Sequence, residues 1–219
     1  VITLLSGYWS SGALLTSVVA GILVGLVSIE VHIASVAILS LIVMFRTIST
    51  MKPNLVKPNE NPESNLKLSE TFKGFNFDML VSGGLLCAIM LEFAVGDWSA
   101  ILIKEDFKIL SGIHTLPFIL FTLSMIIGRL GFHKVLHRFS MQKLAKVAAI
   151  VSGTSFLIGI AAVSAIGTKS HALTIVVLSI SFTFAGIGSS FLGPSMMNAA
   201  NSRSRFPASV VIGQIGVIN

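Results

Sequence analysis

The sequence predicts an all-α protein, a polytopic bundle of transmembrane helices. Three observations indicate this class. Hydrophobic residues make up 53% and charged residues only 11% of the 219 residues, the mean hydropathy is +0.90, and long apolar stretches alternate with mostly short polar ones. A soluble helical protein needs more polar surface than this composition provides. Most of the stretches reach the roughly 20 residues that cross a hydrocarbon layer about 30 Å thick.

Seven apolar spans follow one another along the chain, and each is expected to form one membrane-crossing helix. They are Tyr8–Val27, Val31–Phe45, Phe77–Ile103, Gly112–Gly131, Leu144–Ile166, Ala172–Phe191 and Phe206–Asn219. The gaps between them, apart from one, are short, so consecutive helices should be antiparallel neighbours. The seventh span ends with the chain, and we expect the sequence to be a piece of a longer polypeptide.

Small residues and prolines distinguish individual spans. The first contains Gly21 and Gly25 at helical spacing, and the sixth contains the run GIGSS from Gly186 to Ser190. In lipid, close backbone approach is a main source of helix association, so these positions are expected to be packing faces. Pro117 lies within the fourth span and Pro194 just after the sixth, where each could kink or stop a helix.

Basic residues predict the orientation, because Lys and Arg collect in cytoplasmic loops. Twelve of the 15 Lys and Arg residues lie in alternate gaps, which follow the second, fourth and sixth spans. They are Arg46, Lys52, Lys57, Lys67, Lys73, Arg129, Lys134, Arg138, Lys143, Lys146, Arg203 and Arg205. We therefore expect loops 46–76, 129–146 and 194–205 to be cytoplasmic, in a multi-pass protein of the plasma membrane.

One gap is long and polar. Residues 46–76 include the stretch KPNLVKPNENPESNLKLSE, which is too poor in apolar residues to bury a core of its own. We expect a cytoplasmic linker at 48–76, between a pair of helices in residues 1–47 and five helices in residues 77–219. The net charge of +6 is explained by these loops and gives no reason to expect nucleic acid as a partner.

No pattern predicts an enzyme, a cofactor or a metal site. The five histidines are scattered over different loops, and His133 and His137, four residues apart, lie among basic residues with no carboxylate nearby. A Gly-rich phosphate loop of the GxxxxGK type is absent, which disfavours ATP-driven transport. Cys87 is the single cysteine, so the sequence contains no disulfide framework.

Glu92 is the candidate for chemistry, because it is the only acidic residue well inside a span. An ionised side chain at a helix centre costs about 2.5–3.5 kcal/mol on insertion scales, so it normally faces a cavity or a partner. Two interpretations stay open. Glu92 either couples proton movement to solute binding, or it is a carboxyl group neutralised by a hydrogen bond to a neighbouring helix.

Three further residues are candidate proton or solute contacts. Asp97 follows Glu92 on the same span, and Trp98 beside it is typical of a headgroup-level anchor. His114 opens the next span and could pair with Glu92 or Asp97 if the loop folds back. Gln214 offers a neutral donor in the last span. Solvated interfacial groups at Asp97 and His114, and interhelical hydrogen bonding at Gln214, are the alternatives.

The stretch GRLGFHKVLHRF, together with the long linker, resembles the major facilitator superfamily of transporters. Members carry a G-x-x-x-D-R-x-G-R-type loop after the second helix and a weaker copy after the eighth. The candidate copy here comprises Gly128, Arg129, His133, Lys134 and Arg138. EFAVGDWSAIL and GIGSSFLGPSMMNAANSRSRFPASVVIGQIG resemble the seventh and the tenth to eleventh helices of bacterial members near the fucose permease-like group. The chain would then cover the fifth to eleventh helices of an incomplete bundle.

The resemblance implies a secondary active transporter that moves a small, sugar-like solute by alternating access, as a proton symporter, with a lipid bilayer, a solute and protons as partners. His133 stands where the family pattern has an acid, so the charge network of that loop does not carry over intact. The first span lacks the Gly-Pro pair of proton-drug antiporters, which favours uptake. Efflux of a drug or metabolite, and a truncated membrane protein without transport activity, remain alternatives.

Overall fold

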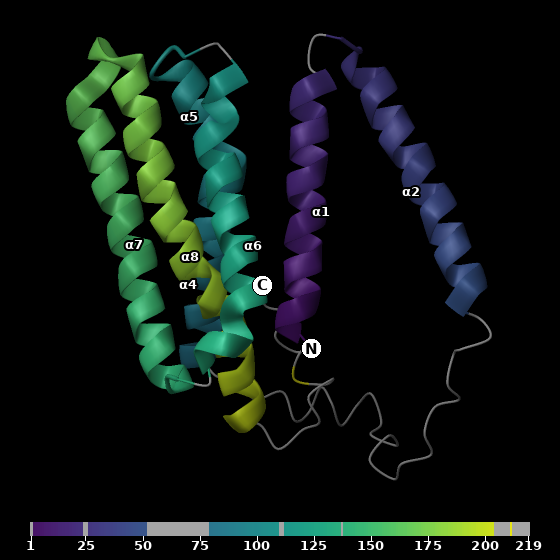
Figure 1. Ribbon diagram of the computed structural model, residues 1–219, viewed down its shortest axis with the longest axis vertical. Coiled ribbons are helices and arrows are strands. Elements are labelled where there is room, and N and C mark those ends of the chain that lie inside the picture. Colours follow the sequence, from purple (N-terminus) through teal and green to yellow (C-terminus); the bar gives the residue numbers. More distant parts are fainter. Residues whose placement is uncertain are drawn as a thin grey trace. The chain divides into compact units, whose positions relative to one another are not determined.

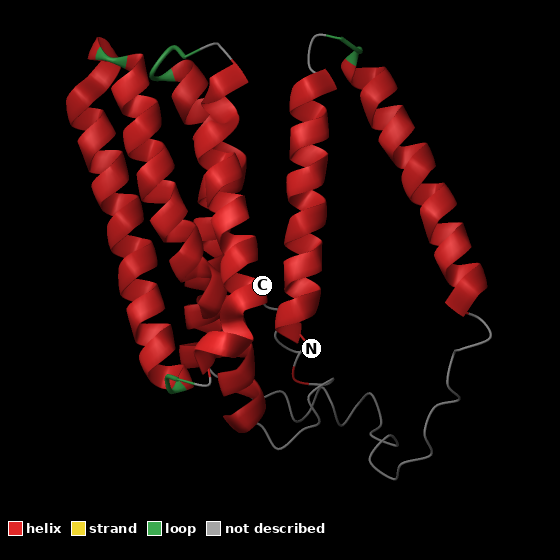
Figure 2. Cartoon of the chain, viewed as in Figure 1, coloured by secondary structure: helices red, strands yellow, loops and turns green. Residues whose placement is uncertain are grey.

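The computed structural model describes residues 2–23, 26–51, 79–109, 112–136, 138–203 and 211. All regular elements in these ranges are helices, and no β-strand occurs among them (Figure 2). Five of the described helices are long and apolar enough to cross a membrane. The predicted fold class, an all-α bundle of membrane-spanning helices, is confirmed.

The helices follow the predicted spans in order (Figure 1). They are α1 (Ile2–Leu23), α2 (Ile29–Met51), α4 (Met79–Phe93), the π-helical segment η3 (Ala94–Trp98), α5 (Ser99–Glu105), the 3-10 turn η4 (Gly112–Thr115), α6 (Leu116–Leu136), α7 (Met141–Ile166), the turn η5 (Gly167–Lys169) and α8 (His171–Arg203). The first six predicted spans each coincide with a helix or a run of helical segments. The seventh lies outside the described residues, except that Val211 is helical.

Three predicted loops are shorter than expected because helices run into them. α2 continues to Met51, α6 continues to Leu136, and α8 continues to Arg203. The prediction ended each span where its apolar run ended. An α-helix does not have to stop where its surroundings become polar, so the predicted helix ends at Phe45, Gly131 and Phe191 were too early. The remaining part of loop 46–76, from residue 52, lies outside the described residues.

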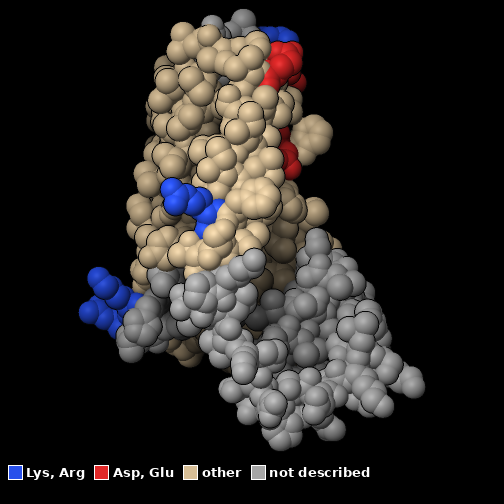
Figure 3. All heavy atoms as spheres, turned by 90° about the vertical axis from the view of Figure 1, so that its right-hand side faces the viewer, with Lys and Arg blue, Asp and Glu red and all other residues tan. Residues whose placement is uncertain are grey.

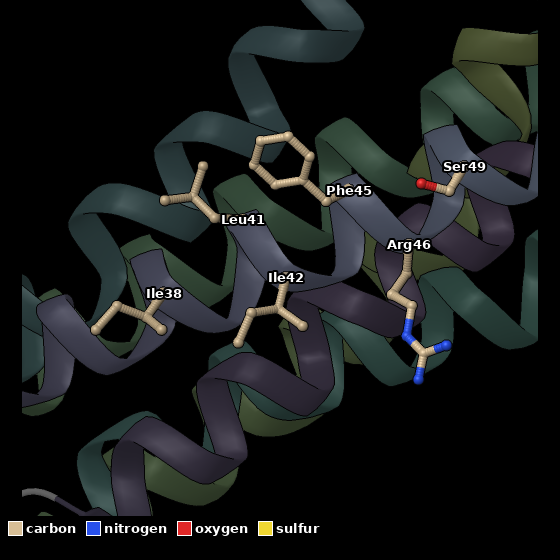
Figure 4. Close-up of a pocket in the computed structure, with 6 residues that line it drawn as sticks. All are labelled: Ile38, Leu41, Ile42, Phe45, Arg46 and Ser49. Carbon is tan, nitrogen blue, oxygen red and sulfur yellow. The ribbon is translucent and has the colours of Figure 1, made fainter.

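The chain divides into two units, one comprising Val1–Ser17 and Asn76–Asn219 and the other Val18–Phe75. In the second unit α2 has no buried residue, and the side chains of Leu39 and Phe45 are 62% and 66% exposed. Such a helix is apolar on every side, as expected for a segment in a lipid environment. Its six residues in Figure 4 lie along one stripe of α2 and border an open hollow on its surface.

Helix α8 is the central element of the first unit. It packs against α4, α6 and α7 (Figure 1), and it contains five of the ten buried serines among the described residues. Pro194 lies inside α8 and is buried, so it does not stop the helix as one interpretation expected. The 33 residues of α8 span about 50 Å at 1.5 Å each, longer than the hydrocarbon layer.

Small residues bring α7 and α8 together. A Cβ atom on Gly188 of α8 would lie 2.6 Å from the carbonyl oxygen of Ala148 and 2.7 Å from Cβ of Ser152 on α7. The Ser152 hydroxyl donates a 3.0 Å hydrogen bond to the carbonyl of Ala185 across the same interface. The small-residue run in α8 is therefore a packing face, as its spacing predicted.

A cluster of large apolar side chains packs together at the end of the bundle near the loop that joins α5 to α6. Its fully buried members include Val95, Ile103 and Phe121. Phe182 of α8 stacks on Phe156 of α7, with ring centroids 5.6 Å apart. In the view of Figure 3, residues other than Lys, Arg, Asp and Glu make up most of the described surface, as a helix bundle in lipid requires.

The α7–α8 contact generates a prediction. Gly188→Ala should lower the free energy of unfolding by about 1–3 kcal/mol, because the added methyl group has no space against Ala148 and Ser152. Gly153→Ala on α7 is the matched control, since a Cβ atom there meets nothing within 4 Å. Unfolding of both purified proteins in detergent measures the difference. Equal stability of Gly188→Ala and the parent chain would contradict the described interface.

Candidate functional site

A buried ion pair joins α4 to α6. Nη2 of Arg129 lies 2.7 Å from Oε1 of Glu92, and the two side chains are 6% and 20% exposed. Glu92 lies in the middle of the continuous helical span Val81–Glu105, and Arg129 lies seven residues before the end of α6. The antiparallel course of the two helices brings the two residues to the same level.

Two serines extend the ion pair to two more helices. Nη1 of Arg129 donates a hydrogen bond to Oγ of Ser10 on α1, and Oγ of Ser189 on α8 donates to Oε1 of Glu92 at 3.4 Å. Ser10 and Ser189 are 1% and 0% exposed. We call these four residues, Ser10, Glu92, Arg129 and Ser189, the Glu92–Arg129 cluster. It is a polar group within apolar helices, and its hydrogen bonds reduce the cost of burying the charges.

Glycine residues allow the helices of the cluster to approach closely. Gly128 precedes Arg129, and a Cβ atom on it would lie 2.7 Å from Cβ of Ser190, the residue after Ser189. A Cβ atom on Gly7 would lie 3.1 Å from Cδ2 of Leu130, where α1 meets α6. The Gly-Arg pair at 128–129 therefore combines close helix packing with a buried charge.

The helices on both sides of the cluster depart from regular α geometry. Residues Ala94–Trp98, directly after Glu92 on the same span, form one π-helical turn. In α8, Pro194 lies five residues after Ser189 and cannot donate a backbone hydrogen bond to the carbonyl of Ser190. π-turns often occur at functional sites, and both irregularities lie within two turns of the ion pair.

The other predicted site residues do not join the cluster. Asp97 lies in the π-turn and is exposed, beside Trp98, which is 67% exposed. His114 lies in η4, 15 residues before Arg129 and so about 22 Å away along the helix axis. The two described partners of Glu92 are Arg129 and Ser189, so the suggested pairing with His114 is not found. Gln214 lies outside the described residues.

The predicted cytoplasmic loop motif belongs mostly to a helix. Gly128, Arg129, His133 and Lys134 all lie in α6, and only Arg138 lies between α6 and α7. The prediction placed Arg129 in the cytoplasmic loop 129–146. Its side chain instead reaches Glu92 inside the bundle, because α6 continues for seven residues beyond it.

Sequence reasoning missed the partner of Glu92, although a signal was present. Arg129 follows the apolar run LSMIIG and is followed by Leu130, Gly131 and Phe132. A basic residue with apolar neighbours on both sides is as unusual as Glu92, and two opposite charges in neighbouring antiparallel spans are natural partners. Counting Arg129 with the loop cations concealed this relation.

Two other features of the described residues offer no alternative site. A hollow of about 350 Å³ lies at the α5 end of the bundle, where Trp98, Leu102, Phe156 and Phe182 form much of its wall. Its lining is largely apolar and does not include Glu92 or Arg129. No group of three or more His, Cys, Asp or Glu residues among the described residues could hold a metal ion. The Glu92–Arg129 cluster is therefore the candidate site.

No protein-family model, curated protein or solved structure matches the chain.

The ion pair generates a stability prediction. Arg129→Leu and Glu92→Leu should each lower the free energy of unfolding by about 3–5 kcal/mol, because each leaves the other charge buried without its partner. The double variant Glu92→Leu/Arg129→Leu should recover most of that loss. Lys104→Leu is the control, since its 3.9 Å pair with Glu105 is more than half exposed and should contribute little. Additive losses in the double variant would show that the pair makes no coupled contribution.

Proposed function

We propose that the chain belongs to a secondary active transporter that moves a small solute across the bacterial inner membrane by alternating access. The observation that carries this proposal is the Glu92–Arg129 pair, which is buried between spans in the apolar part of the bundle. Charged residues inside membrane helices are costly, and they commonly mark the pathways of solutes, ions and protons.

The surroundings of the pair support a transport role. Transporters commonly place their sites near the bilayer midplane and build them from interrupted helices. Glu92 lies in the middle of its span and is followed by the π-turn, and Ser189 precedes the proline of α8. A purely structural ion pair has no need of these irregularities.

We assign the proton-coupling role to Glu92. Of the two charged partners, Arg129 keeps its proton at every physiological pH, whereas a carboxylate can bind and release one. Glu92 is also the more exposed of the two. Its protonation would weaken the link between α4 and α6, which connects proton binding to the relative position of two helices. The solute class implied by the resemblance is sugar-like, and the chain is expected to act as a symporter of the major facilitator type.

Glu92→Gln tests the coupling role. Expressed in cells that lack uptake systems for the tested sugars, the parent should accumulate a radiolabelled hexose or 6-deoxyhexose faster at pH 6 than at pH 8. The variant cannot take up the proton, so its uptake should fall at least tenfold or lose its pH dependence. Asp97→Asn is the matched control, because Asp97 is an exposed acid on the same span. A variant with the parent's rate and pH profile would remove Glu92 from the mechanism.

Cysteine labelling tests the orientation. After Cys87 is replaced by alanine, single cysteines at Lys57 and Lys143 should react with an impermeant maleimide only in inside-out vesicles, because both lie in gaps predicted to be cytoplasmic. A cysteine at Lys169, in the turn η5 between α7 and α8, should react only in right-side-out cells. Reaction of positions 57 and 143 from opposite sides would contradict the proposed topology.

A further inference from the structure

We propose that the solute carries a carboxylate and that Arg129 binds it, in exchange for Glu92. This inference rests on the proposed function and specifies the solute class of the same site. A guanidinium that is 6% exposed retains its positive charge, and burial makes a nearby negative charge necessary. In the described structure Glu92 provides it.

Protonation of Glu92 changes this balance. When the carboxylate takes a proton from water, the negative charge opposite Arg129 disappears while the guanidinium remains in place. An arriving anion would restore that charge, whereas a neutral sugar would not. Protonation of Glu92 therefore favours binding of the anion at Arg129, and binding of the anion favours protonation. This mutual effect is the thermodynamic definition of coupling between a proton and an anion. One proton and one monovalent carboxylate add no net charge to the site.

The geometry around Arg129 fits a carboxylate. Its two terminal nitrogens point to different partners, Nη1 to Ser10 and Nη2 to Glu92, and a planar guanidinium can hold both oxygens of a carboxylate. Ser189, which now donates to Glu92, supplies a hydroxyl donor at the same place. In the exchange, a solute oxygen takes the place of Oε1 of Glu92 beside Nη2 of Arg129. Glu92 is the more exposed partner of the pair.

The other titratable and charged residues on the surrounding helices lie away from the pair or are exposed. α1 contributes only Tyr8, which is 66% exposed, and the charged or titratable residues of α8 are His171 and Arg203 at its two ends. Among the residues whose side chains the structure describes, the remaining ones on nearby helices are Cys87, Asp97, Lys104, Glu105, Lys134, Lys143 and Lys146, all exposed. His114 in η4 lies about 22 Å from Arg129 along the helix axis. We assign the proton to Glu92 because its carboxylate is the acidic group in direct contact with Arg129.

Matched ligand pairs test the inference directly. Purified protein in nanodiscs is titrated by calorimetry at pH 6 and pH 8 with D-glucuronate and D-glucose, with D-galacturonate and D-galactose, and with L-lactate and 1,2-propanediol. At least one carboxylate should bind tenfold or more tightly than its neutral counterpart, and more tightly at pH 6 than at pH 8. The inference is overturned if no carboxylate exceeds its counterpart, or if affinity rises with pH.

Variants separate the two partners. Glu92→Gln should bind the carboxylate equally well at both pH values, because the competing negative charge is gone. Arg129→Gln should lose at least tenfold in carboxylate affinity, and Arg129→Lys should recover part of the loss. If Arg129→Gln does not fold, Glu92→Leu/Arg129→Leu replaces it and should show no carboxylate preference. Lys104→Gln, at an exposed position, is the control for unchanged binding. A preference that survives in the double variant would overturn the assignment to Arg129.

Flux measurements in liposomes distinguish this inference from the proposed function. Uptake of neutral sugars with a Glu92-dependent pH profile, without preference for the acids, would overturn the carboxylate site and leave the transport proposal standing. Carboxylate binding at Arg129 without any solute flux would support the site and overturn the transport proposal.

Discussion

A guanidinium buried among apolar helices cannot lose its charge, and most of the first unit is arranged around this constraint. Arg129 needs a negative charge at hydrogen-bonding distance, and Glu92 supplies it from a different helix at 2.7 Å. The pair therefore sets the register between α4 and α6. Ser189 links α8 to the pair through its hydrogen bond to Glu92, and Ser10 links α1 through the hydrogen bond that it accepts from Arg129. Four helices meet where one charge has to be balanced.

Small residues at the helix interfaces allow the helices of the Glu92–Arg129 cluster to pack closely. Gly128 and Gly188 remove the side chains that would hold α6 and α7 away from α8. Short backbone distances let the serine side chains of α8 reach across the interfaces to other helices. In a bundle surrounded by lipid, where apolar side chains gain little by leaving one another, such contacts contribute much of the association between helices.

The described helices could largely be predicted from the sequence, and the site could be predicted only in part. Apolar length identified six spans, because a helix that crosses lipid must satisfy its backbone internally. Helix ends were less predictable, since α6 and α8 extend past the first basic or proline residue. Glu92 was recognisable as a buried acid by its position in an apolar span. Its partner was not, because a contact between residues 37 positions apart leaves no local pattern, and because Arg129 resembled a loop cation.

The adjacency of Gly128 to Arg129, and of Ser189 to Ser190, has an evolutionary consequence. Charge balance and steric fit occupy neighbouring positions on both helices, so that Ser189 contacts Glu92 while Ser190 fills the space that Gly128 leaves. A substitution at any one of these positions is therefore tolerated only if the residues at the other positions still fit it. Among divergent descendants of this gene, positions 92, 128, 129, 189 and 190 should covary as one group, and a lineage that abandons the arginine should also be free to abandon the glycine.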